Sequence, residues 1–159
     1  MRKKRLSHLK KREKRLGMSQ LGNGIVKKLI DANVVLRYLL QDDDGLFRKA
    51  STLLERAKLG EEAVVIPESV LAECVYVLLK VYKIERPVVS EKLRGLFAYK
   101  GIVNPDKKDL IDSIILFGQT QLSIVDCIAC SKSINHGMSL FTFDADLRSI
   151  YSKRMRSSM

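Results

Sequence analysis

Residues 24–40 read G-I-V-K-K-L-I-D-A-N-V-V-L-R-Y-L-L and indicate a strand followed directly by a helix. The apolar residues before Asp31 are typical of a short strand, and from Val34 onward apolar residues recur with helical spacing. Asp31 therefore lies at a strand-to-helix corner. Ligands of open α/β sheets bind at the carboxyl ends of strands, so an acid there faces a binding site. The alternative is that Asp31 or Asn33 caps the helix.

A second corner of this kind occurs near the end of the chain. Residues 139–143, S-L-F-T-F, indicate a strand that runs into Asp144. If this strand and the first one are neighbours in a parallel sheet, the carboxylates of Asp31 and Asp144 are adjacent in space. Asp146 is either a further acid of the same group or a cap of the last helix.

Two more acids lie in apolar helical segments. A helix is expected from Glu68 to about Tyr82, after a short strand at 63–66 and Pro67, and it carries Glu73 among apolar residues. Asp126 lies at the head of another apolar helix. A buried ionised carboxylate costs several kcal/mol unless it is paired. Both carboxylates are therefore expected to be paired with a cation or bound to a metal ion.

The remaining polar residues have structural interpretations. The run Asp42–Asp44 is expected to form a solvated turn with helix capping, and His136 to be a cation at a helix C-terminus. Helices are also expected near residues 47–57, 87–97 and 108–122. Solvent exposure or helix starts account for Asp106, Asp109 and Asp112, and burial in helices accounts for the three cysteines, Cys74, Cys127 and Cys130.

Length and composition indicate one globular domain. The chain has 159 residues, of which 46% are hydrophobic, and no apolar run approaches the ~20 residues that span a bilayer. With no export signal, a cytoplasmic location and no membrane contact are expected. The net charge of +11 is concentrated in residues 1–28, which hold eleven Lys and Arg against one acid. Residues 1–24 are thus expected to form a flexible basic arm, residues 25–153 the domain, and residues 154–159 a tail. Either the arm adds RNA affinity, or it is dispensable and translation starts at Met18.

Four clustered carboxylates need a counter-charge, because they would otherwise raise one another's pKa. A hard divalent cation such as Mg²⁺ or Mn²⁺ provides it. The sequence has no glycine-rich phosphate loop and no G-x-S-x-G nucleophile motif. The pattern therefore favours hydrolysis of a phosphate ester by metal-activated water, and the basic charge favours a polyanionic substrate.

Four segments, in order, also resemble the motifs of the PIN-domain nucleases, most closely the VapC-type toxins. They are I-D-A-N-V-V-L (30–36), E-S-V-L-A-E-C-V-Y-V-L (68–78), S-I-V-D-C-I-A (123–129) and L-F-T-F-D-A-D-L (140–147). The resemblance implies a three-layer α/β/α fold with a central, mostly parallel sheet. It also implies Mg²⁺- or Mn²⁺-dependent endoribonuclease activity that leaves a 5′-phosphate and a 3′-hydroxyl, a homodimer, and inhibition by a cognate antitoxin protein.

Transferred by position, the resemblance makes Asp31, Glu73, Asp126 and Asp144 the catalytic metal ligands, with Asp146 as a possible addition. Asn33 or Thr142 would orient ligands or water. Two other interpretations compete with this one. The segment around Asp31 also resembles the first motif of haloacid-dehalogenase-type phosphatases, but Asn33 stands where those enzymes need a second aspartate. A PIN-like module that only binds RNA or protein is the non-enzymatic alternative.

Overall fold

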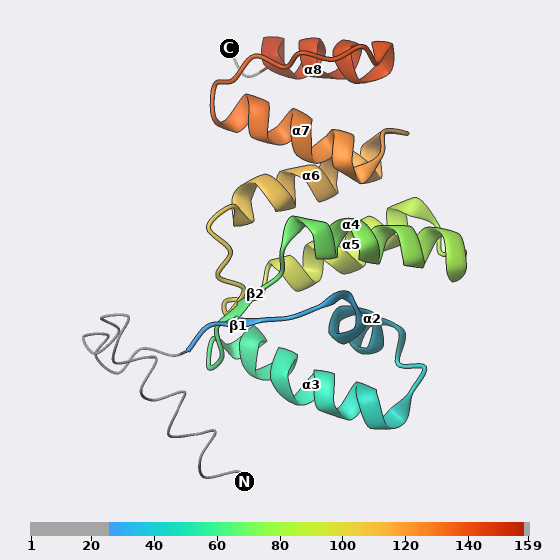
Figure 1. The fold of residues 1–159 in the computed structure, drawn as a ribbon, viewed down its shortest axis with the longest axis vertical. Coiled ribbons are helices and arrows are strands. Elements are labelled where there is room, and N and C mark those ends of the chain that lie inside the picture. Colours follow the sequence, from blue (N-terminus) through green and yellow to red (C-terminus); the bar gives the residue numbers. More distant parts are fainter. Residues whose placement is uncertain (1–25, 158–159) are drawn as a thin grey trace, which may run out of the picture.

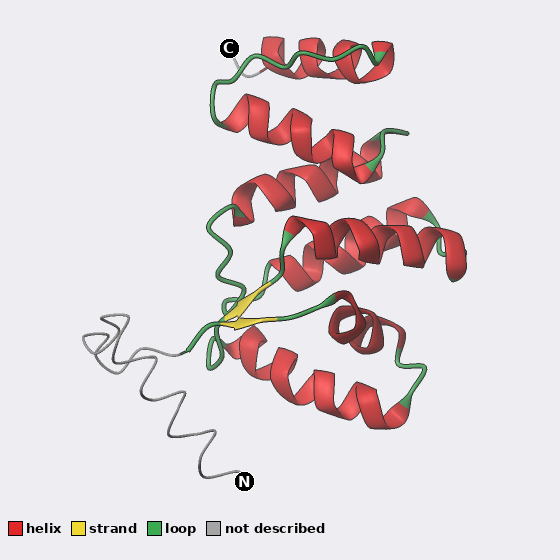
Figure 2. Cartoon of the chain, in the orientation of Figure 1, coloured by secondary structure: helices red, strands yellow, loops and turns green. Residues whose placement is uncertain are grey.

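The structure is a computed structural model, which describes residues 26–157. These residues form a mostly helical α/β domain with a small parallel sheet (Figure 2). The elements in chain order are β1 (Lys28–Leu29), α2 (Ala32–Leu40), α3 (Asp44–Leu59), β2 (Val64–Val65), α4 (Glu68–Tyr76), the π-helical turn η2 (Val77–Val81), α5 (Arg86–Phe97), α6 (Lys107–Gln119), α7 (Ile124–Asn135) and α8 (Ala145–Ser157).

The sheet consists of β1 and β2, which pair in parallel with Lys28 opposite Val64. An isolated parallel bridge between Val64 and Ile102 extends it on the other side of β2. Just after β2, the buried side chain of Asn104 forms the two backbone hydrogen bonds that a neighbouring strand would otherwise form. Its amide nitrogen donates to the Ile66 carbonyl at 2.7 Å, and its amide oxygen accepts from the Ile66 amide at 3.0 Å. Both backbone groups of Ile66 are thereby satisfied in a buried position.

Helices cover both sides of the sheet, which confirms the predicted three-layer α/β/α class. Figure 1 shows α2 and α3 on one side of the strands and α4 and α5 on the other. Helices α6, α7 and α8 continue the stack beyond α5, each packed against the one before it. The last helix, α8, therefore lies at the opposite end of the molecule from α3.

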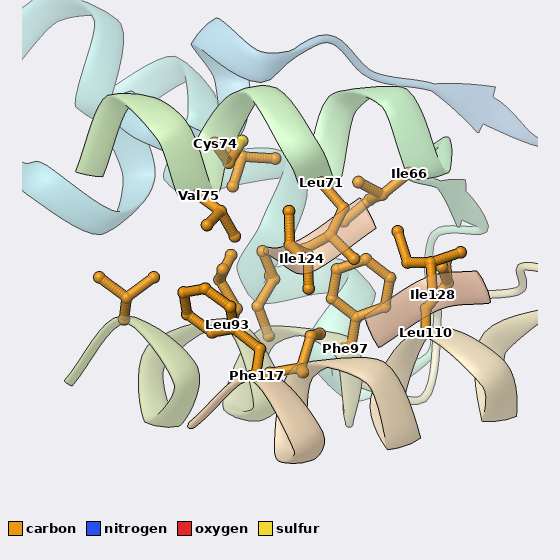
Figure 3. Packing of buried hydrophobic residues seen from close by; sticks show 14 of the residues in the cluster. Ile66, Leu71, Cys74, Val75, Leu93, Phe97, Leu110, Phe117, Ile124 and Ile128 are labelled. Atoms are coloured by element: carbon orange, nitrogen blue, oxygen red, sulfur yellow. The ribbon is translucent and has the colours of Figure 1, made fainter. Parts of the chain in front are cut away.

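One continuous hydrophobic core joins these helices. Figure 3 shows Leu71 of α4, Leu93 of α5, Phe117 of α6 and Ile124 of α7 converging in it. Burial of each such side chain stabilises the fold by about 1.5–3 kcal/mol. Because α4 and α7 share this core, the helices that carry Glu73 and Asp126 are held near each other.

Most expected helices are present, and local capping explains their ends. Asp43 accepts from the Leu46 amide at 2.8 Å and starts α3, which confirms the capping role of the Asp42–Asp44 turn. Gly60 ends α3 with φ of 86°, a left-handed conformation that glycine adopts without strain. Within residues 26–157, no helix is long and apolar enough to cross a membrane.

The strand predicted at 139–143 is not present, and that prediction was wrong. The segment is a loop, in which Phe141 and Phe143 are 86% and 88% exposed and contact each other edge to face. A strand requires hydrogen bonds to the backbone of a neighbouring strand. In this loop, side chains form hydrogen bonds with the backbone instead. Arg148 donates to the Thr142 carbonyl, and the Asp144 amide donates to Thr142 Oγ1 at 3.0 Å.

The predicted basic arm at residues 1–24 lies outside the described residues, so the division into arm, domain and tail stays a prediction.

Candidate metal centre

Asp31 lies between β1 and α2, at the predicted corner. Its backbone is extended, and its Oδ1 accepts a hydrogen bond from the Val34 amide at 3.1 Å. The capping alternative is therefore correct for Asp31. The side chain is exposed, and its second oxygen has no hydrogen-bond partner within residues 26–157. Capping thus leaves one oxygen available for a ligand. Asn33, two residues on, is also exposed.

Glu73 lies in α4 on an exposed face, so the expectation that it is buried among apolar residues was wrong. The neighbouring Cys74 points into the core instead, where its thiol faces the Ala32 carbonyl across 3.9 Å. Burial, together with the negative charges of Glu73 and Asp31, raises the pKa of the Cys74 thiol to about 12. Both carboxylates therefore lie near this one thiol, at the contact of α4 with α2.

Asp126 lies in the first turn of α7 and is half-buried. The Ser123 hydroxyl donates to its Oδ2 at 2.6 Å and accepts from its backbone amide at 3.1 Å. This reciprocal cap fixes the orientation of the carboxylate, and the positive end of the helix dipole stabilises its charge. Ser123 was not among the predicted site residues, although the S-x-x-D spacing is a sequence signal for such a cap.

Asp144 caps α8, since its Oδ1 accepts from the Leu147 amide at 2.8 Å. The Asp144 amide donates to Thr142 Oγ1, which orders the backbone before the cap. Asp126, Asp144 and Asp146 together line a cavity of about 440 Å³ between the start of α7 and α8. The other lining residues are Gln121, Leu122, Ser123, Ser149, Ile150 and Lys153.

The predicted acids thus form two groups. Asp31 and Glu73 lie at α2 and α4, whereas Asp126, Asp144 and Asp146 lie at α7 and α8. Within residues 26–157, no three His, Cys, Asp or Glu side chains are close enough together to hold one metal ion. The condition for adjacency of Asp31 and Asp144 was that each follows one of two neighbouring strands. It is not met, because among residues 26–157 β1 pairs only with β2 and no strand directly precedes Asp144.

The donor chemistry nevertheless fits a hard divalent cation. None of these five acids has a Lys, Arg or His partner within 4.0 Å among residues 26–157, whereas eight other acids in that range do. Carboxylate oxygens that are accessible to water and not neutralised by a protein cation are the ligands Mg²⁺ and Mn²⁺ prefer.

The three cysteines are buried and free, as expected. Burial raises the pKa of the Cys127 thiol to about 12 and also raises that of Cys130. A neutral thiol is a poor metal ligand. Cys127 and Cys130 are therefore core residues of α7.

Solvent exposure or a helix start was expected to account for Asp109. It does lie in the first turn of α6, but the expected solvent exposure was wrong. Asp109 is 4% exposed, and its Oδ2 lies 2.8 Å from Nε2 of His136 at the end of α7. Asn135 donates to its other oxygen at 2.8 Å. His136 does end a helix as predicted, and it also joins α7 to α6.

The sequence model of the PIN domain matches residues 28–153, which include all five acids. The chain belongs to the PIN domain family. PIN domains are generally metal-dependent nucleases, so the family agrees with the carboxylate donors described above. No curated protein and no solved structure gives a significant match to the chain.

Proposed function

We propose that this PIN domain protein is a Mg²⁺- or Mn²⁺-dependent endoribonuclease. The observation that carries the proposal is the set Asp31, Glu73, Asp126 and Asp144. All four lie within the family match, and all are accessible or half-buried without a protein cation among the described residues. Carboxylates without a protein cation are the ligands that a hard divalent cation prefers.

These four side chains are the proposed ligands of the cation, with Asp146 as a further candidate. In the described conformation of residues 26–157 no three of them are close enough together for one ion, so the assignment rests on their donor chemistry and on the family match. A bound divalent cation would lower the pKa of a water molecule and stabilise the negative charge on the phosphate. The chain's own contribution is orientation. Ser123 fixes the Asp126 carboxylate, and Thr142 orders the backbone at Asp144. Asn33 lies in the first turn of α2, two residues after Asp31. The cut would leave a 5′-phosphate and a 3′-hydroxyl.

RNA is the proposed substrate because the charge of the chain suits a polyanion. The net charge is +11, and α8, which follows Asp144 and contains Asp146, also carries Arg148, Lys153 and Arg156 on exposed positions. Basic side chains near the acids attract the phosphate backbone by counterion release. This charge also distinguishes the substrate from a small neutral ester.

We further propose the role of a VapC-type toxin, with a cognate antitoxin and a homodimer as protein partners and the cytoplasm as location. The motif resemblance at residues 30–36, 68–78, 123–129 and 140–147 supports this role. Exposed apolar side chains on several elements are candidate contacts for such partners. They include Val26, Leu29, Tyr76, Val81, Phe141 and Phe143.

The test is cleavage of total RNA by the purified full chain, with Mg²⁺, with Mn²⁺ and with EDTA. Asp126→Asn keeps the side-chain shape and removes the charge, and Glu91→Gln on α5 is the matched control. We expect discrete fragments with either metal, none with EDTA, at least 100-fold less product from Asp126→Asn, and full activity from Glu91→Gln. Equal activity of Asp126→Asn and wild type would overturn the assignment.

One observation favours a second candidate, a PIN module that binds RNA or protein without cutting it. Within residues 26–157, no three of the acids are close enough together to form a metal site. Folded protein that binds RNA but produces no metal-dependent fragments would establish this candidate. Membership in the PIN family removes the haloacid-dehalogenase-type interpretation.

A further inference from the structure

The cavity between the start of α7 and α8 has opposite charges at its two ends. Asp146, Ser149, Ile150 and Lys153 line it from one face of α8, because residues three, four and seven positions apart share a helix face. Asp144 and Asp146 lie at the start of α8, and Lys153 lies about two turns further along, roughly 10 Å by the helical rise. The groove is therefore acidic at one end and basic at the other.

Among the described residues, no side chain pairs with the ammonium of Lys153. Its ammonium forms no salt bridge and no hydrogen bond to another side chain within residues 26–157. Its side chain is exposed on the rim of the groove. The other α8 cations differ from it. Arg148 donates to the Thr142 carbonyl, Arg154 to Gln119, and Arg156 to the Ser152 carbonyl.

A groove lined by three carboxylates repels a phosphate chain unless cations compensate. A metal ion held by the acids compensates only where it binds. A phosphate further along the groove needs a positive charge from the protein, and Lys153 supplies the one lysine or arginine that lines this cavity in the described part of the chain.

We propose that the groove between α7 and α8 binds the backbone of single-stranded RNA, with Lys153 contacting a phosphate that flanks the one to be cut. This inference rests on the proposed function, because it assigns the substrate to the same site. The flanking phosphate follows from the separation of two helical turns between Lys153 and the acids, which places the ammonium too far along α8 for the reacting phosphate.

The test compares four full-length proteins on one labelled single-stranded RNA that the wild type cuts: wild type, Lys153→Ala, Lys153→Arg and Lys49→Ala. Lys49 is an exposed lysine on α3, at the other end of the molecule, so its loss makes the same change in net charge (Figure 1). The readouts are KM, kcat and the dependence of kcat/KM on salt, with thermal unfolding to show that each variant is folded.

We expect Lys153→Ala to raise KM about fivefold or more, with kcat within twofold of wild type. The slope of log kcat/KM against log salt should fall by about 0.7, the value for one lost contact to a single strand. Lys153→Arg should restore KM, and Lys49→Ala should behave as wild type. Active wild type with an unchanged KM and salt slope in Lys153→Ala would overturn this inference alone. Loss of kcat without a change in KM would overturn it too. Inactive wild-type protein would overturn the proposed function with it.

Discussion

The hydroxyl of Ser123 and the carboxylate of Asp126 lie 2.6 Å apart and form a closed pair at the start of α7. Ser123 donates to Asp126 Oδ2 and accepts from the Asp126 backbone amide at 3.1 Å. One hydroxyl therefore both caps the helix and orients a candidate metal ligand. We therefore expect stability and activity to be coupled at this position.

Ser123→Ala should lower both the stability of the fold and the cleavage activity. Loss of an N-cap side chain costs about 1 kcal/mol of unfolding free energy. The freed Asp126 carboxylate should also lower kcat, because a ligand in several rotamers holds a metal less firmly. Urea unfolding and RNA cleavage check the two effects. Ser123→Thr keeps the hydroxyl and should recover most of each, and an Ala variant that loses stability but keeps full kcat would contradict the orienting role.

Glu73→Gln should reduce cleavage without changing the stability of the fold. Because Glu73 is exposed and forms no ion pair in the described range, its neutralisation should change the unfolding free energy by less than about 0.5 kcal/mol. Cleavage should nevertheless fall at least 100-fold if the carboxylate binds the metal. Denaturant unfolding and cleavage assays on one preparation test both statements, and unimpaired cleavage would remove Glu73 from the ligand set.

Metal binding should raise thermal stability. A ligand that binds only the folded state at 100 times its Kd adds about 2.7 kcal/mol. Thermal unfolding with and without millimolar Mg²⁺ or Mn²⁺ should show an upward shift for wild type. The double variant Asp31→Asn/Asp144→Asn should lack this shift, and Glu91→Gln should keep it. An equal shift in the double variant would place the metal elsewhere.

Asp109 should make the fold sensitive to acid. Burial alone would raise the pKa of Asp109, but hydrogen bonds from His136 and Asn135 outweigh it, so the pKa of the folded state lies below the ordinary value. The stabilisation is then complete above the unfolded pKa of about 3.9 and is lost as pH falls through the lower folded pKa. Asp109→Asn should be less stable at pH 7 by roughly 1–3 kcal/mol and should lose less between pH 5 and pH 3. Unfolding curves at several pH values test this, with Glu91→Gln as control; parallel pH profiles for Asp109→Asn and wild type would contradict it.

The exposed phenyl groups of Phe141 and Phe143 should drive self-association. Two large apolar side chains in water favour a protein contact, and Phe141 and Phe143 contact each other in the same exposed loop. Phe141→Ser/Phe143→Ser should therefore weaken any dimer at least tenfold, as measured by light scattering over a concentration series. Leu59→Ser, which removes an exposed leucine on α3, should leave the dimer unchanged. Unaltered association of the double serine variant would exclude this segment from the interface.

The sequence by itself determined the local structure and the family. The corner at Asp31, the start of α3 at Asp43 and its end at Gly60 follow from capping, in which each residue bonds to backbone groups three or four positions away. Apolar periodicity predicted most of the helices, because it too depends on residues three or four positions apart in the chain. The acids that lie within the PIN match were also found from sequence, since motif order and spacing are properties of the chain.

Only the tertiary structure decided which groups meet. Glu73 is exposed because α4 turns Cys74 toward the core. Asp109 is buried because α6 packs against the end of α7, where it meets His136, which is 27 positions away in the chain. Residues 139–143 have the composition of a strand but form a loop. A strand exists only if another segment supplies its hydrogen bonds, and that depends on packing between elements distant in sequence.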